Sequence, residues 1–403
     1  MDRFEILSIV IITSFLFSCG GKKAEKPAEE VEVLPAVPVY PMTVPFETGI
    51  ETEREVLLSE IADSVKYIPL ETNDKCLIRA LKDANILKTD KYFFLPWVEA
   101  LFQYTTDGKF VRKIGRKGSG PGEFVWISQI DVDEEKGLVF MMTTSQRINV
   151  YDMESGKFLR SMKSPDIESG DFSMLNDTTS VTFVRNTNGK RKTRIYISDI
   201  KGDTLKTFPR SDLFELNSQY SWMMSSSTDR YMFRYENMVC CKDYYNDTLF
   251  IVTKDLLEPR YIFQMGKYSL PIECRFEYLD GDNKRYQSLA APYIRYQAIE
   301  TDPYLFMPYS NWAGENARKQ QMAMFDKKTG DCYKLIGGVI KNDLSGGLPL
   351  RPVASLDSKT LLYVWEVQDI FKEAEKNPEI LNQEQLKGIG EDDNPVLMIV
   401  YLK

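Results

Sequence analysis

A recurring hairpin pattern limits what this chain can fold into more than any other feature of its sequence. Each copy reads as a strand, a short turn that contains aspartate, a glycine and a second strand. The glycines of the first three copies lie about 47 residues apart, close to the length of one four-stranded propeller blade. Such a repeat favours a β-propeller, in which each blade buries its faces against its neighbours. The four copies occupy residues 104–111, 151–159, 197–205 and 324–333.

The segments around these hairpins also have the pattern of strands. Short apolar or aromatic runs alternate with turns rich in Asp, Gly, Asn and Lys, which is typical of a sandwich, a barrel or a propeller. Only residues 367–386 have a helical pattern, and we interpret them as an insertion between late strands. We therefore predict an all-β fold, a β-propeller of four-stranded blades with a short helical insertion near residues 367–386.

A glycine-rich segment at residues 114–124, followed by residues 130–133, resembles the signature of NHL repeats. In that family such a loop links one blade to the next and leads into its innermost strand. Over about residues 54–403 the chain resembles the six-bladed β-propeller lipoproteins of Gram-negative gut anaerobes, with further similarity at residues 64–72, 246–250 and 346–349.

The resemblance and the repeat length imply different blade counts. A unit of about 47 residues would allow seven blades. The resemblance implies six, with the helical insertion and loops near residues 275–290 and 310–320 taking up the surplus. Most of that family has no assigned function, so the resemblance implies a fold rather than an activity.

The N-terminal residues have the pattern of a bacterial lipoprotein export signal. An apolar run at residues 6–17 is too short to span a membrane, which takes about 20 residues, but suits a signal-peptide core. It leads through Leu16 and Ser18 to Cys19, the position that receives lipid in such proteins. Residues 1–5 are less basic than usual, and the alternative is a plain secretory signal with Cys19 incidental.

These features divide the chain into three parts. We predict a signal peptide at residues 1–18, a tether rich in Pro and Glu at residues 19–53 that starts with lipidated Cys19, and the propeller at residues 54–403. We expect the protein to be lipid-anchored in the cell envelope, at the outer membrane. Whether it faces the periplasm or the outside, and its oligomeric state, are left open.

Histidine is absent from all 403 residues. Its absence excludes Ser-His-Asp and Cys-His catalysis and histidine-ligated zinc. The formal net charge of −8 provides no basic surface for nucleic acid. Besides Cys19 there are five cysteines, whose spacing specifies no disulfide framework. We expect no cofactor, no metal ion and no nucleic-acid partner.

Two local motifs resemble ligand loops but depart from them at essential positions. Gly115 and Gly120 have phosphate-loop spacing, yet Pro121 stands where the lysine is required. Residues 131–135 resemble the start of a calcium loop, but Lys136 replaces its turn glycine. We interpret the first motif as a loop between blades and the second as a solvated turn.

Tryptophans supply the candidate ligand contacts. In propellers, ligands generally bind over the central channel among loops that enter the innermost strands, and all five tryptophans lie in or beside segments that we assign to such loops. Exposed tryptophans stack on sugar faces or peptide side chains, although large aromatic residues also wedge between blades. We select Trp126, Trp222 and Trp312, with Gln129 and Arg147 as neighbouring polar contacts.

Two functions remain open at this point. The first is a non-catalytic binding or interaction module that captures a glycan, a peptide or an envelope protein. The second is a carbohydrate-active enzyme, a lyase or hydrolase, that uses carboxylates and tyrosine. No catalytic residue set is visible in the sequence, and the propeller fold implies no chemistry of its own. We therefore favour the binding module.

Overall fold

The computed structural model describes residues 39–403. It leaves out residues 79–80, 82–84, 98–99, 144–146, 166–168, 187–188, 216–229, 277–282 and 346. Cys19, most of the predicted tether and Trp222 lie outside the described residues.

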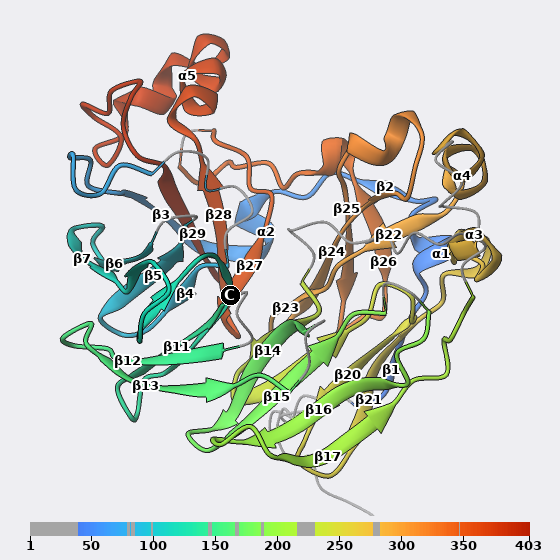
Figure 1. Ribbon diagram of the computed structural model, residues 1–403. Coiled ribbons are helices and arrows are strands. Elements are labelled where there is room, and N and C mark those ends of the chain that lie inside the picture. The colour runs from blue at the N-terminus through green and yellow to red at the C-terminus, as the bar shows by residue number, and fades with distance from the viewer. Residues whose placement is uncertain are drawn as a thin grey trace, which may run out of the picture. The chain divides into compact units, whose positions relative to one another are not determined.

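Six sheets of mainly antiparallel strands form the blades of a propeller (Figure 1). In blades 1 to 3 the innermost strand comes first and the later strands pair outward in sequence order, whereas each of the other three blades also takes its outermost strand from near the N-terminus of the described chain. The structure therefore confirms the predicted all-β propeller and the six blades that the resemblance implied. Six is compatible with the length because the connections between several strands are long.

Blades 1 to 3 each contain four consecutive strands. Blade 1 consists of β4 (Leu87–Lys88), β5 (Tyr92–Pro96), β6 (Leu101–Thr105) and β7 (Phe110–Ile114). Blade 2 consists of β10 (Ile127–Asp133), β11 (Leu138–Thr143), β12 (Arg147–Asp152) and β13 (Phe158–Lys163). Blade 3 consists of β14 (Ser169–Asn176), β15 (Thr179–Val184), β16 (Thr193–Asp199) and β17 (Thr204–Pro209).

Blades 4 to 6 each include strands from elsewhere in the chain. Blade 4 has β18 (Met232–Tyr235), β19 (Met238–Lys242), β20 (Thr248–Val252), β21 (Leu257–Phe263) and the added β1 (Met42–Val44). Blade 5 has β22 (Ile294–Tyr296), β23 (Ile299–Glu300), β24 (Tyr304–Asn311), β25 (Gln321–Asp326), β26 (Cys332–Leu335) and the added β2 (Glu53–Arg54). Blade 6 has β27 (Ala354–Asp357), β28 (Thr360–Trp365), β29 (Val396–Leu402) and β3 (Ala62–Pro69).

Both faces of a blade are buried, because each sheet packs against the sheets on either side of it. In β24, Leu305 and Met307 pack with blade 4, whereas Phe306 between them packs with blade 6. Cys240 and Cys241 on β19 divide in the same way between the cores shared with blades 5 and 3. Successive residues of a strand point to opposite faces, so these strands read as continuous apolar runs. Burying one such side chain stabilises the fold by about 1.5–3 kcal/mol.

The ring is closed by pairing between early and late segments of the chain. Strand β3 pairs antiparallel with β29, with Tyr67 opposite Met398, and forms the outer edge of blade 6. Before it, β1 and β2 add parallel strands to the outer edges of blades 4 and 5. The folded unit therefore begins before residue 54, further toward the N-terminus than we predicted. Two prolines of the predicted tether, Pro41 and Pro45, flank β1, and an edge strand tolerates them.

The helices lie between strands, and the predicted insertion is among them. Helix α5 (Val367–Lys376) and the 3-10 helix η4 (Pro378–Asn382) connect β28 to β29, which confirms the prediction at residues 367–386. Helices α3 (Glu273–Phe276) and α4 (Asn283–Ala290) between blades 4 and 5 were not predicted. The remaining helical segments are α1 (Phe46–Gly49), α2 (Leu58–Ile61), η1 (Gly266–Tyr268), η2 (Glu315–Arg318) and η3 (Ile336–Gly338). Among the described residues, no helix has the length and apolar character needed to cross a membrane.

The predicted hairpins join the third and fourth strands of blades 1, 2, 3 and 5. Their glycines have positive φ, a conformation that residues with a Cβ rarely adopt. These glycines and their φ values are Gly108 (87°), Gly156 (68°), Gly202 (85°) and Gly330 (78°).

The glycine-rich loop joins blade 1 to blade 2 through the short strands β8 (Arg116–Lys117) and β9 (Glu123–Phe124), and β10 follows. Gly122 in this loop has φ +70°, and a Cβ there would lie 2.5 Å from Cγ of Phe158. The loop is therefore a packed connection between blades.

Candidate functional site: the central cavity

The antiparallel order of the strands sorts their connections onto two ends of the ring. One end, which we call the rim face, is where the innermost strands begin and where second strands pass to third strands. The opposite end, which we call the turn face, is where innermost strands turn into second strands. Helices α4 and α5 therefore lie at the rim face, and Glu236 and Ser358 lie in turns at the turn face.

A cavity of about 330 Å³ lies on the axis of the ring. The segments that form or lead into the innermost strands of all six blades contribute to its wall. Its volume is at the lower end of the range for small-molecule sites. By blade, the wall includes residues 85–88, residues 129–132, Phe172 with Ser173, residues 232–234, residues 297–299 and residues 353–357.

A carboxylate and a guanidinium from different blades meet in this wall. Nε and Nη2 of Arg234 on β18 donate to Oδ1 and Oδ2 of Asp131 on β10, at 3.1 Å and 2.9 Å. Nη2 of Arg234 also donates to the carbonyl oxygen of Met174 on β14. One side chain therefore joins blades 2, 3 and 4, and the bidentate geometry fixes its direction.

Asp131 receives further donors from the next blade. The hydroxyl of Ser173 and the backbone N–H of Met174 both donate to Oδ2 at 2.7 Å. The N–H of Val132 donates to Oδ1 at 2.9 Å. With the guanidinium, these donors use most of the lone pairs of the carboxylate. Asp131 is thus held as an acceptor, which is unfavourable for a role in proton transfer.

Asp171, at the beginning of β14, holds blade 4 in a similar way. Its Oδ2 accepts from the N–H groups of Tyr231 and Met232 at 3.0 Å and 2.9 Å, and its Oδ1 accepts from Phe172 N–H at 3.0 Å. Burial raises the pKa of Asp171 to about 6, although these N–H groups and the charge of Arg230 lower it. Desolvation of the charged form is the dominant effect.

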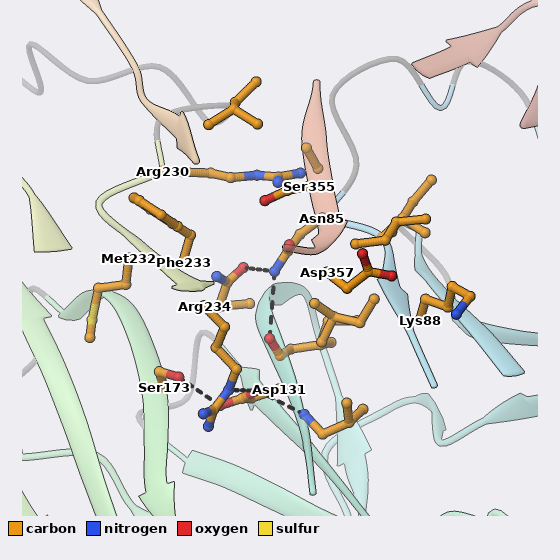
Figure 2. A pocket seen from close by; sticks show the side chains of 18 of the residues that line it. Asn85, Lys88, Asp131, Ser173, Arg230, Met232, Phe233, Arg234, Ser355 and Asp357 are labelled. Atoms are coloured by element: carbon orange, nitrogen blue, oxygen red, sulfur yellow. Dashed lines mark hydrogen bonds and ion pairs between the residues drawn. The ribbon is translucent and has the colours of Figure 1, made fainter. Parts of the chain in front are cut away.

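The other polar side chains of the cavity lie apart from this ion pair. Figure 2 shows Arg230 extending toward Ser355 and Asn85, whereas Arg234 extends toward Asp131 and Ser173. Nδ2 of Asn85 donates to Oε1 of Gln129 at 2.7 Å, which links blades 1 and 2. The amide oxygen of Asn85 and the amide nitrogen of Gln129 complete a wall that can accept and donate hydrogen bonds.

The buried amine of Lys242 also contributes to the cavity wall. Its Nζ donates to the carbonyl oxygens of Asp243 and Asn246 at 2.6 Å and 2.8 Å. Burial lowers the pKa of Lys242 to about 8, against the opposing charges of Asp247 and Asp243. Since its donors are directed to backbone carbonyls, we assign it a structural role. Within the described ranges, no group of three or more Cys, Asp or Glu side chains is placed to hold a metal ion.

A protein family matches nearly the whole described chain. Its description is "Domain of unknown function (DUF4934)", and the match covers residues 41–401. The chain belongs to this family. The match begins one residue before β1, in agreement with a folded unit that starts before residue 54. The search of curated proteins finds no match.

Solved structures resemble the fold of this DUF4934 member. A crystal structure of a protein from Bacteroides fragilis, named "Putative exported protein", superposes with a TM-score of 0.67 at 18% identity, covering 90% of this chain and 100% of the other. A member of the DUF4221 family from Bacteroides vulgatus has a TM-score of 0.48 at 10% identity, covering 85% and 97% of the two chains. The first similarity shows the propeller fold alone.

The residues that we selected from the sequence fall in three different environments. Gln129 lies in the cavity wall, whereas Arg147 is exposed at the start of β12. Trp126 is exposed in the loop before β10, with 45% of its surface accessible. Trp312 is buried, and its ring stacks on Tyr245 with centroids 5.0 Å apart. Ligand binding by these residues and by Trp222, and lipidation of Cys19, stay predictions.

The tryptophans differ in position from our interpretation. Of the four that the structure describes, only Trp126 lies in a loop that enters an innermost strand. Trp97, Trp312 and Trp365 lie at or just after the ends of second strands, in blades 1, 5 and 6. These positions share the rim face with Trp126. Sequence patterns did not distinguish the two kinds of loop, because both are polar segments between apolar strands.

Sequence reasoning missed the ion pair of the cavity. Asp131 was considered as part of the NHL-like signature and of a calcium-loop motif but not as an ion-pair partner, and Arg234 was not considered. One feature of the sequence could have identified both residues. Each charged residue lies within an apolar innermost strand, where a charge requires a buried partner.

Proposed function

We propose that this protein is a membrane-tethered, extracytoplasmic propeller that binds a small polar ligand without catalysis. The ligand would be a glycan or peptide group, held alone or as part of an envelope protein partner. The observation that supports this best is the central cavity, to which all six blades contribute wall residues. Its volume is sufficient for a small ligand, and its amides, hydroxyl and guanidinium groups can recognise one.

The proposed location rests on separate observations. Residues 1–19 have the pattern of a lipoprotein signal, with Cys19 as the lipid acceptor. The name of the relative from Bacteroides fragilis describes it as exported. A Cys19→Ser variant is expected to lose incorporation of radiolabelled palmitate and to leave the membrane fraction. Equal labelling of the two proteins would contradict the anchor.

The enzymatic alternative has less support in the cavity. A glycosidase needs two carboxyl groups placed on either side of the bond that it breaks. Asp131 is committed to Arg234 and to three further donors. Of the carboxyl side chains in the wall, which also include Glu236 and Asp357, the one held at the junction of three blades is therefore suited to a structural role rather than to proton transfer.

The proposal can be tested by thermal unfolding of the protein in the presence of oligosaccharides, peptidoglycan fragments and short peptides. A ligand at about 100 times its dissociation constant adds about 2.7 kcal/mol of stability. In the variant Ser355→Phe, a ring fills the cavity from β27, and the shift is expected to disappear. Trp126→Ala is the matched variant at the rim face and is expected to keep the shift.

The two variants separate the cavity from the rim. A shift that survives Ser355→Phe but disappears in Trp126→Ala would move the site to the exposed tryptophan. The unliganded melting temperature of each variant shows that the fold is retained. No shift with any ligand of the panel would overturn small-ligand binding for those classes and favour a protein partner.

A further inference from the structure

Two side-chain amides in the wall of the central cavity form a hydrogen-bonded pair with one unused atom on each side. Nδ2 of Asn85 donates to Oε1 of Gln129 at 2.7 Å and to the carbonyl oxygen of Ile130 at 3.5 Å. A backbone carbonyl oxygen can only accept, so these bonds fix which atom of the Asn85 amide is the nitrogen. Among the described residues, neither Oδ1 of Asn85, an acceptor, nor Nε2 of Gln129, a donor, has a partner.

The unused donor belongs to a buried residue. Gln129 is only 8% exposed, yet its Nε2 is not one of the unpaired atoms that the described chain encloses completely. The open side of this nitrogen therefore faces the cavity, whose wall Gln129 helps to form. A polar group that has lost most of its hydration gains from a partner that enters the site. Gln129 thus directs a donor at whatever occupies the cavity.

Several charged groups of the cavity wall already have partners within the protein. Arg234 and Asp131 bind each other. Lys242 directs its amine to two backbone carbonyl oxygens. The charge of Arg230 stabilises the ionised form of the buried Asp171. An ionic ligand group would compete with these existing pairs, so a neutral group fits the wall better.

The remaining charges of the wall lie at its other end. Lys88 and Asp357 are the last residues of β4 and β27, and Glu236 follows β18, so all three are at the turn face. Asn85 precedes β4 and Gln129 is the third residue of β10, so the amide pair lies toward the rim face. A ligand group at the pair is therefore separated from these charges by several residues along the innermost strands.

An amide group of a ligand matches the two unused atoms. They lie at opposite ends of the pair, with Nδ2 of Asn85 and Oε1 of Gln129 bonded between them. A hydroxyl group carries its donor and its acceptor on one oxygen atom, whereas an amide carries its carbonyl oxygen and its N–H on different atoms. Half-buried Phe233 and Val353 in the same wall offer apolar surface for a methyl group.

From this arrangement we infer that the central cavity recognises an acetamido group of its ligand. The carbonyl oxygen of that group accepts from Nε2 of Gln129, and its N–H donates to Oδ1 of Asn85. Its methyl group contacts Phe233 or Val353. This recognition rests on the proposed function and adds to it the chemical group that the cavity selects. An N-acetylated amino sugar and an N-acetylated amino acid both carry such a group.

The test is isothermal titration of the protein with N-acetyl-D-glucosamine, with acetyl-L-alanine methylamide and with D-glucose, which has a hydroxyl in place of the acetamido group. At least one of the two amides is expected to bind at least about tenfold more tightly than glucose, the effect of two hydrogen bonds. Tighter binding of N-acetylglucosamine identifies an amino sugar as the source, and tighter binding of the alanine derivative identifies a peptide. Glucose that binds as tightly as both amides would overturn the inference.

Matched variants locate the selectivity. Gln129→Glu keeps an oxygen for Nδ2 of Asn85 but removes the N–H donors, and it is expected to reduce the preference for the amide over glucose by about tenfold. Asn316→Asp makes the same change of amide to carboxylate in an exposed residue of η2 outside the wall, and it is expected to leave the preference unchanged. An unchanged preference in Gln129→Glu, or an equal reduction in both variants, would overturn the site. The comparison of ligands on the unaltered protein does not depend on either variant.

Two results separate a loss of acetamido selectivity from a loss of ligand binding altogether. Equal affinity for glucose and the amides, removed by Ser355→Phe, would overturn the acetamido group but keep the cavity as a ligand site. No binding of the three compounds at millimolar concentration, together with a shift by another ligand of the thermal unfolding panel that Ser355→Phe removes, would do the same. No binding in either experiment would overturn both the acetamido group and the proposed small-ligand site.

Discussion

Asp131 and Asp171 lie on the innermost strands of neighbouring blades, and each anchors the following blade. Each carboxylate accepts a hydrogen bond from the N–H of the residue that follows it in its own strand. Each also accepts at least one N–H from the next blade, either from its innermost strand or from the residue just before that strand. The two carboxylates differ in whether a cation contacts them directly. Asp131 binds the guanidinium of Arg234 directly, whereas burial dominates at Asp171 and raises its pKa to about 6.

The comparison shows what a cation in contact adds to the same backbone arrangement. N–H groups alone can hold a carboxylate in place, but they replace only part of its lost hydration. At the junction of blades 2 and 3, the guanidinium of Arg234 replaces the remaining hydration of Asp131. To reach Asp131, Arg234 extends along the wall of the central cavity. Part of the polarity of the cavity is therefore structural, and ligand recognition falls to the other groups of the wall.

Removing that cation should have the largest effect. Arg234→Met leaves Asp131 buried without its ion pair, and we expect a loss of about 3 kcal/mol in the free energy of unfolding. Ser173 and two N–H groups still bind the carboxylate, which keeps the loss at the lower end for a broken buried pair. Urea denaturation measures this loss in the free energy of unfolding. The double variant Asp131→Asn, Arg234→Met should recover about half, and no recovery would contradict the role assigned to Arg234.

The pH dependence of stability should identify Asp171. Its pKa is near 4 when unfolded and about 6 when folded, so the folded state binds the proton more tightly. Its contribution is fully present below the unfolded pKa and is lost as the pH rises through about 6. Relative to Asp171→Asn, the wild type should lose about 2 kcal/mol between pH 4 and pH 7. If the stability difference between the two proteins does not change with pH, the N–H groups outweigh burial in setting the pKa of Asp171.

A smaller effect is expected from the hydroxyl that contacts Asp131. Ser173→Ala removes one hydrogen bond to the carboxylate and should lower the free energy of unfolding by about 1 kcal/mol. The same substitution in an Asp131→Asn background should have less effect, because the neutral amide is a weaker acceptor. Equal losses in both backgrounds would show that the hydroxyl acts independently of Asp131.

The smallest effect is expected outside both junctions. Trp126 is exposed and lies before β10 rather than within it. Trp126→Ala should change the free energy of unfolding by less than about 0.5 kcal/mol. A larger loss in the same denaturation experiment would show that this ring packs as a wedge, and it would remove Trp126 from the candidate ligand contacts.

The sequence predicted those parts of the fold that local chemistry specifies. The turn glycines, exemplified by Gly108, need positive φ and recur at the same position in four of the six blades, so the repeat could be recognised. The helix after Trp365 has an apolar period of its own. In contrast, β1 and β2 are three and two residues long, and they form only because an exposed strand edge is available beside them.

The candidate site was less predictable, for a physical reason. Arg234 and Asp131 are 103 residues apart, and only the packing of blades 2, 3 and 4 around the axis brings them into contact. Residues around the axis come from six separate strands, so no local pattern marks them as neighbours. Gln129 was selected as a polar contact neighbouring the candidate tryptophans, and it reaches the cavity wall because β10, which contains it, is an innermost strand.

Closure of blade 6 also orders events during synthesis. Strand β3 emerges from the ribosome before any of the six innermost strands, whereas its partner β29 emerges after all of them. Until then the nascent chain carries an unpaired strand edge, the kind of surface that promotes aggregation. Pairing across such a sequence separation also slows folding. A propeller closed in this way becomes a complete ring only when β29 pairs with β3, whichever blades have formed before it.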